Sequence, residues 1–270
     1  MDVSEVLEDL VAEQQTLDGI VGGLSLAEWD TPTPSPRWTV TDQIGHLTYF
    51  DRSAAMAIMH SDRFTVQRDQ LFARFDDELA VDELTLGEFR QLAVNDRLAE
   101  WRRRRDELHA AAVTLDNDTR VEWYGPSMGA KSFLTARLME VWAHGQDICD
   151  AVGAERPPTN RLRHIAQLGV ITRKWSYQVR GQEPPDGDVR VELTAPSGDT
   201  WSWGPDAGSA AGSITGPAEH FCLVVTQRRH VDDTDLEVEG ELATDWMTKA
   251  QAYAGGPTDG PVPTSKDGDA

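Results

Sequence analysis

Cysteine is scarce in this chain, which has only Cys149 and Cys222 among 270 residues. Neither belongs to a CxxC pair, and two cysteines are too few for a disulfide framework. Disulfides are characteristic of oxidising compartments, so we expect a protein of the reducing cytoplasm. The acidic, amphipathic first fifteen residues also lack the pattern of a signal peptide.

Long apolar runs and an excess of positive charge are absent as well. No stretch approaches the roughly 18 consecutive apolar residues that a membrane-spanning helix needs. The chain has 25 basic and 46 acidic residues, a formal net charge of −21. This balance argues against binding nucleic acid or an anionic membrane through a general electrostatic field. We expect a small-molecule substrate instead, and both a monomer and a homodimer remain open.

Helical periodicity dominates the first half of the chain, where proline interrupts it mainly at 30–38. The predicted helices cover residues 3–23, 39–60, 85–108 and 132–153. Thr39 or Thr41 can cap the second helix, a capping-box pattern at 85–88 opens the third, and Ser132 caps the fourth. Residues 61–80 are charged and poorly periodic. Four long helices with short connections predict a four-helix bundle over 1–155.

The pattern changes near residue 160. Short alternating segments bounded by Gly, Pro, Asp and Ser predict strands near 189–193, 200–203, 213–216 and 236–240. Helices are predicted over 162–179, 218–228 and 242–253. The fold class is therefore α+β, with a bundle followed by a smaller α/β domain with a short sheet over 156–254. The Gly/Pro/Asp-rich residues 255–270 are predicted to be disordered.

The fourth predicted helix carries Glu140, His144 and Asp147 at positions i, i+4 and i+7. This spacing puts a carboxylate, an imidazole and a second carboxylate along one face. The flanking residues are apolar, so these groups lie in or beside a core. Charged groups there need partners or a cation.

A further histidine, His46, lies in the apolar second helix. If the bundle brings them together, His46, Glu140 and His144 form a three-ligand metal site with an open position, as in catalytic zinc centres. Asp147, one turn further on, is placed to accept a hydrogen bond from an imidazole N–H. The alternative is a surface Glu–His pair with His46 as a hydrogen-bonded core residue, and spacing alone does not decide between them.

Arg228 and Arg229 end the predicted helix over 218–228. Cations at a helix C-terminus stabilise the helix dipole. An arginine there can also bind a substrate carboxylate through two parallel hydrogen bonds. The chain contains no P-loop, GxSxG or HExxH motif, and no GxGxxG follows a strand.

Two segments carry a family resemblance: Trp38-Thr-Val-Thr-Asp-Gln-Ile-Gly-His46-Leu and Glu140-Val-Trp-Ala-His144-Gly-Gln-Asp147. They resemble the DinB-like metal-binding proteins, and more closely the mycothiol-dependent maleylpyruvate isomerases of actinobacteria. The resemblance implies an up-down-down-up bundle in which the two histidines and the glutamate bind a divalent metal, usually zinc. It further implies that water or a thiol sulfur takes the open position.

The resemblance also implies a type of reaction. In the isomerase, the thiolate of mycothiol adds to a cis double bond, rotation follows and the thiol leaves; in related transferases the thiol stays on the product. An arginine of the second domain, here Arg228 or Arg229, would lie near substrate carboxylates. Two alternatives remain: a non-catalytic, metal-stabilised binding module, and a hydrolase that uses metal-bound water. Residues 61–80 and 184–210 depart from the isomerase pattern, so the substrate is not named.

Overall fold

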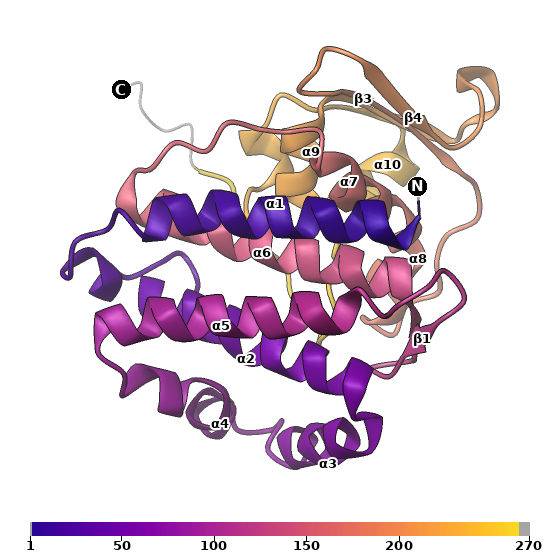
Figure 1. Cartoon of the computed structure of the whole chain (residues 1–270). Helices are drawn as coiled ribbons and strands as arrows, with labels where there is room; N and C mark the ends of the chain where they lie inside the picture. Colours follow the sequence, from indigo (N-terminus) through magenta and orange to yellow (C-terminus); the bar gives the residue numbers. More distant parts are fainter. Residues whose placement is uncertain (1, 265–270) are drawn as a thin grey trace. The chain divides into compact units, whose positions relative to one another are not determined.

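The structure is a computed structural model that describes residues 2–264 (Figure 1). The chain divides into two compact units, Met1–Arg156 and Pro157–Ala270. Residues 255–264 form no helix or strand. The remainder of the predicted disordered tail, residues 265–270, lies outside the described residues.

Four long helices form the first unit. They are α1 (Val3–Val21), α2 (Val40–Met59), α5 (Val94–Ala112) and α6 (Ala130–Val152). Each places apolar side chains at helical spacing on a buried face, with α1 packed on α6 and α2 packed on both α5 and α6 (Figure 1). The predicted four-helix bundle is confirmed.

Ion pairs and hydrogen bonds between the helices define their directions. Asp18 near the end of α1 pairs with Arg102 and Arg105 of α5, while the Val3 N–H at its start donates to Asn117, just beyond the end of α5. These two helices are therefore antiparallel. Arg97 at the start of α5 donates to Thr41 at the start of α2, so α2 and α5 are parallel.

The same reasoning places α6 antiparallel to α2. His46 contacts Glu140, whereas Asp51, further along α2, contacts Arg137, earlier along α6. The order of directions is up-down-down-up, as the resemblance implied.

The ends of α2 and α6 have local causes. Thr39 and Asp42 form a capping box at the start of α2. Gly153, with φ of 67°, ends α6 in the left-handed conformation that glycine adopts without strain.

The third predicted helix, over 85–108, is wrong. Two helices lie in that region, α4 (Glu78–Arg90) and α5, and residues 91–93 separate them. Asp77 caps α4 by accepting from the N–H groups of Leu79 and Ala80, so Thr85 lies inside the helix and donates its hydroxyl to the Val81 carbonyl. The charged segment that gave no clear pattern also contains a helix, α3 (Ser61–Phe72).

Helices α3 and α4 form the connection between α2 and α5, and both pack on α2 (Figure 1). Two parallel helices need a connection that returns along the bundle. A short loop cannot do this, and the two extra helices provide that connection.

The prediction that Ser132 caps the fourth predicted helix, over 132–153, is also wrong. The short strands β1 (Arg120–Val121) and β2 (Met128–Gly129) lead directly into α6, whose N-cap residue is Gly129.

The second unit is built on a small mixed sheet. Its strands are β3 (Val189–Thr194), β4 (Thr200–Trp203), β5 (Gly212–Pro217) and β6 (Glu237–Glu239). Their order is β4-β3-β5-β6, with β3 parallel to β5 and the outer pairs antiparallel. The buried side chains of Val191, Leu193 and Ile214 alternate with more exposed ones. The predicted α+β fold class is confirmed.

Four helices accompany this sheet. They are α7 (Leu162–Ile171), α8 (Arg173–Gln178), α9 (Ala218–Val225) and α10 (Glu241–Met247). The single helix predicted over 162–179 is interrupted at Thr172, and the helix predicted over 242–253 ends at Met247. Short 3-10 turns occur at Glu28–Asp30, Ala207–Ser209 and Val231–Asp233. None of the helices formed by residues 2–264 has the length and hydropathy needed to cross a bilayer.

A buried ion pair joins the two helices that carry the predicted ligands. Arg137 of α6 donates to Asp51 of α2 at 2.9 Å, with side-chain exposures of 2% and 0%. Gln14 of α1 donates to the other carboxylate oxygen at 3.3 Å. Burial raises the pKa of Asp51, and the positive charge of Arg137 opposes that shift. The contact depends on both partners, because either charge alone would be buried without compensation.

We expect the substitution Asp51→Ala to lower the free energy of unfolding by about 3–5 kcal/mol, because it leaves the Arg137 guanidinium buried without its counter-charge. Urea denaturation followed by circular dichroism measures the change. Arg103→Ala is the matched control, since Arg103 forms only exposed pairs with Glu100 and Glu107 along one helix. That variant should lose less than about 1 kcal/mol. Equal losses in the two variants would contradict the role given to the buried pair.

Candidate metal centre

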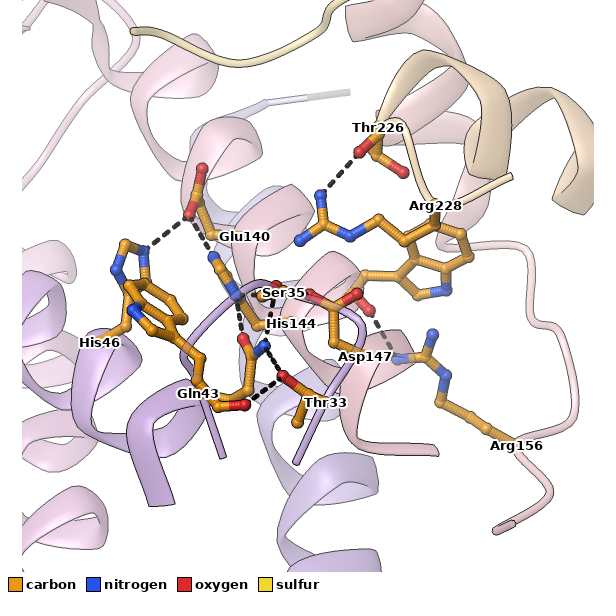
Figure 2. A network of polar contacts seen from close by, with 12 residues as sticks. Thr33, Ser35, Gln43, His46, Glu140, His144, Asp147, Arg156, Thr226 and Arg228 are labelled. Atoms are coloured by element: carbon orange, nitrogen blue, oxygen red, sulfur yellow. Dashed lines mark hydrogen bonds and ion pairs between the residues drawn. The ribbon is translucent and has the colours of Figure 1, made fainter. Parts of the chain in front are cut away.

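The structure brings His46, Glu140 and His144 together within the bundle (Figure 2). Glu140 Oε2 lies 3.2 Å from His46 Nε2 and 3.1 Å from His144 Nε2. All three candidate ligand atoms lie within 4.8 Å of one another. The carboxylate oxygen thus faces ring nitrogens from two different helices.

Two local features produce this convergence. The i, i+4 spacing puts Glu140 and His144 on one face of α6, and the antiparallel crossing of α2 presents His46 to that face. The side chains are 17%, 23% and 11% exposed for His46, Glu140 and His144. They are shielded from most solvent and are not completely buried.

Aromatic rings flank the imidazoles. The centroid of the Trp38 ring lies 5.2 Å from that of His46 and 5.9 Å from that of His144, and Phe50 lies 4.5 Å from His46. The Trp38 indole N–H donates to Asp82 at 3.3 Å, which fixes the ring. These apolar surfaces exclude water from the sides of the site and strengthen electrostatic interactions inside it.

The protonation of His46 and Glu140 suits metal binding. Burial, followed by the positive potential of His144, lowers the pKa of His46 to about 4. Burial of Glu140 opposes ionisation, but its polar contacts with the imidazoles of His144 and His46 outweigh that effect and hold the pKa of the carboxyl well below its usual range. At neutral pH the site therefore offers a neutral imidazole and a carboxylate, the forms that ligate metals.

Gln43 is the residue that the sequence analysis missed. Its amide oxygen lies 2.5 Å from Nδ1 of His144, and its side chain is fully buried. Asp147, predicted to accept from an imidazole N–H, has its nearer oxygen 3.8 Å from the same nitrogen and accepts instead from the Ser35 hydroxyl at 3.2 Å. The available signal was position: Gln43 stands three residues before His46 on α2 and therefore shares its face.

The donor set fits a divalent metal. Two imidazole nitrogens and one carboxylate oxygen are the ligands of many catalytic zinc sites, which leave a fourth position open. One imidazole is held at its second nitrogen by Gln43, as metal-ligating histidines commonly are. Metal binding by these residues stays a prediction. The geometry specifies the ligand atoms that it would use, which are Nε2 of His46, Oε2 of Glu140 and Nε2 of His144.

Arg228 and Arg229 belong to the second unit. Helix α9 ends at Val225, so the prediction that they end a helix is wrong; Gln227, with φ of 58°, turns the chain before them. The backbone N–H groups of both arginines donate to the Leu223 carbonyl. The Nη1 atom of the Arg228 side chain donates to the Thr226 carbonyl at 2.6 Å (Figure 2). A catalytic role for either arginine stays a prediction.

The chain resembles known proteins along nearly its whole length. Two uncharacterized proteins of Mycobacterium tuberculosis, Rv0036c and MT0041, are each 43% identical to it over 259 residues, which cover 95% of this chain and 98% of theirs. The relationship therefore includes both units.

Solved structures show the same fold. The crystal structure of a mycothiol-dependent maleylpyruvate isomerase superposes with a TM-score of 0.54 at 18% identity, covering 84% of this chain and 90% of that one. A histidine-to-alanine mutant of such an isomerase gives a TM-score of 0.56 at 17% identity, covering 88% and 93%.

The family assignment comes from the sequence itself. Residues 10–149 match the family described as "Mycothiol maleylpyruvate isomerase N-terminal domain". This range contains α2 and nearly all of α6, and with them His46, Glu140 and His144. The resemblance noted from the two motifs is confirmed: the chain belongs to the mycothiol maleylpyruvate isomerase family.

Proposed function

We propose that the protein is a metal-dependent enzyme that uses a low-molecular-weight thiol, mycothiol or a close analogue, to isomerise a small electrophilic substrate. One observation carries the proposal: His46, Glu140 and His144 converge from two helices in a chain of this family. The donor set favours zinc among divalent metals. Transfer of the thiol to the substrate is the variant of this reaction in which the thiol does not leave.

The residues have distinct roles in this proposal. His46, Glu140 and His144 would hold the metal, whose positive charge favours thiolate over thiol near neutral pH. Trp38 and Phe50 limit access of water to the two imidazoles. The thiolate adds to one carbon of a cis double bond, the new single bond rotates, and the same thiolate leaves. The reaction consumes no oxidant and releases the thiol unchanged.

Two further predictions belong to the proposal. Arg228 or Arg229 would bind a carboxylate of the substrate, as a guanidinium does through two parallel hydrogen bonds. A cytoplasmic location is supported by the two cysteines, Cys149 and Cys222, which are both buried and unpaired. The substrate itself is open, and maleylpyruvate is the first compound to test.

We expect purified protein to contain near-stoichiometric divalent metal by elemental analysis, and His144→Ala to lose most of it because one ligand is gone. For any substrate that is turned over, with maleylpyruvate tested first, turnover should require both zinc and mycothiol. Gln67→Ala is the control, because Gln67 lies on α3 and donates to Ser53 rather than to a ligand. That variant should keep its metal and its turnover.

Other outcomes of this experiment separate the alternatives. Turnover with zinc but without thiol would indicate a hydrolase. Loss of thermal stability on chelation, with no turnover of any electrophile–thiol pair, would indicate a metal-stabilised binding module. Metal-free wild-type protein, together with an unchanged metal content in His144→Ala, would refute the metal centre.

The neutral His46 required here gives the metal-free protein a dependence on pH. Because its pKa falls from 6.5 to about 4 on folding, the unfolded chain binds more protons between those values. The free energy of unfolding should therefore decrease as the pH falls from about 6.5 to about 4, by roughly 1–3 kcal/mol from this group. Urea denaturation of chelated protein at several pH values measures it. An identical slope in His46→Gln would contradict the assignment.

A further inference from the structure

The contact between Gln43 and His144 depends on a segment that the sequence analysis treated only as a connection. Gln43 Nε2 lies 2.8 Å from the Thr33 hydroxyl and 3.0 Å from the Ser35 hydroxyl, both in the proline-rich stretch before α2. This stretch is ordered by its own backbone, since the Thr33 N–H donates to the Trp38 carbonyl at 2.9 Å and the Trp38 N–H to the Ser35 carbonyl at 3.1 Å.

The hydroxyl groups of Thr33 and Ser35 donate their protons to acceptors other than Gln43. Thr33 donates its proton to the Trp38 carbonyl at 3.0 Å. Ser35 donates to the Asp147 carboxylate at 3.2 Å, and an ionised carboxylate can only accept. Both hydroxyls must therefore accept hydrogen bonds from Gln43. An amide donates only through its nitrogen, so the NH₂ group of Gln43 faces the two hydroxyls.

This orientation determines what His144 can do. With its NH₂ group held by Thr33 and Ser35, Gln43 presents its carbonyl oxygen to Nδ1 of His144 at 2.5 Å (Figure 2). An acceptor at that distance requires a proton on Nδ1. In the neutral imidazole the lone pair is then on Nε2, which faces Glu140 at 3.1 Å. A lone pair and a carboxylate facing one another repel unless a positive charge lies between them.

We propose that Gln43 is a positioning residue that holds His144 in its Nδ1–H tautomer, so that the Nε2 lone pair points to the metal position, and that Thr33, Ser35 and Asp147 orient Gln43 for this purpose. The inference rests on the proposed function in taking Nε2 of His144 as a ligand atom. Asp147 thus supports the site through Ser35 and Gln43 and is not itself the acceptor from the ring.

The chain permits a sharp test with two substitutions at one position. Gln43→Leu removes the acceptor together with the amide donors and leaves an apolar side chain that is one atom shorter. Gln43→Glu keeps an acceptor for Nδ1–H and loses the amide donors. Two properties are measured for each variant: the zinc dissociation constant, by competition with a chromogenic chelator, and the His144 tautomer in zinc-free protein at pH 8, from its ring ¹⁵N chemical shifts. Neither readout depends on catalysis.

We expect wild type and Gln43→Glu to show the Nδ1–H tautomer and Gln43→Leu to show a mixture. The zinc dissociation constant of Gln43→Leu should rise about 10–100-fold, as for the loss of other groups that orient metal ligands. Gln43→Glu should bind zinc at least as tightly as wild type. The combined Thr33→Val and Ser35→Ala change lets the amide rotate and should also weaken binding. Gln67→Leu, an equivalent change on α3, should have no effect.

The outcomes distinguish this inference from the proposed function. An Nε2–H tautomer in wild type, or an unchanged tautomer and zinc affinity in Gln43→Leu, would overturn the role of Gln43 while leaving the metal centre in place. If Gln43→Leu does not fold, the His144 tautomers measured in wild type and in Gln43→Glu test the role of Gln43. If wild type binds no zinc, the proposed function fails, and the tautomer measurement still tests the orientation of His144.

Discussion

The antiparallel packing of α2 on α6 is the constraint on which the candidate site depends. The buried pair of Arg137 and Asp51 lies beside the site, three residues before Glu140 on one helix and five after His46 on the other. A slide of one helix past the other by a single turn would separate the two buried charges and would also move His46 away from Glu140 and His144. Since uncompensated buried charge is strongly unfavourable, the pair that stabilises the helix register also preserves the geometry of the site.

The sequence predicted those parts of the fold whose signals are local. Helices α1, α2 and α6 have long apolar faces, and α2 and α6 have recognisable ends in the Thr39–Asp42 capping box and in Gly153. The region of α3 and α4 was mispredicted because α3 buries only Phe64 and Leu71 and has no clear apolar stripe, while the cap that begins α4, Asp77, lies eight residues before the capping-box pattern at Thr85. The end of α9 was mispredicted because the left-handed residue after it is Gln227, where a glycine would have marked the turn.

The candidate metal ligands could be predicted from the sequence, whereas the residues that orient them could not. Helical spacing and the family motifs identify His46, Glu140 and His144, whose convergence needs only that two helices cross. Gln43 lies within the first of these motifs, but the motif assigns it no role, because that role depends on hydroxyl groups from a loop whose position no periodicity encodes. Asp147 was assigned the nearest imidazole N–H from its spacing along α6, but the facing helix brings Gln43 closer to that nitrogen, at 2.5 Å against 3.8 Å.

The separation of the ligands along the chain has a consequence of its own. His46 and Glu140 are 94 residues apart in sequence, and the intervening segment contains α3, α4 and α5. Closing a loop of that length has an entropic cost that grows only slowly with length. An ion held by residues on both sides of the loop would act as a reversible cross-link, present in the folded chain and absent from the unfolded one. Its release would loosen the attachment of the whole middle of the bundle, and not only three side chains.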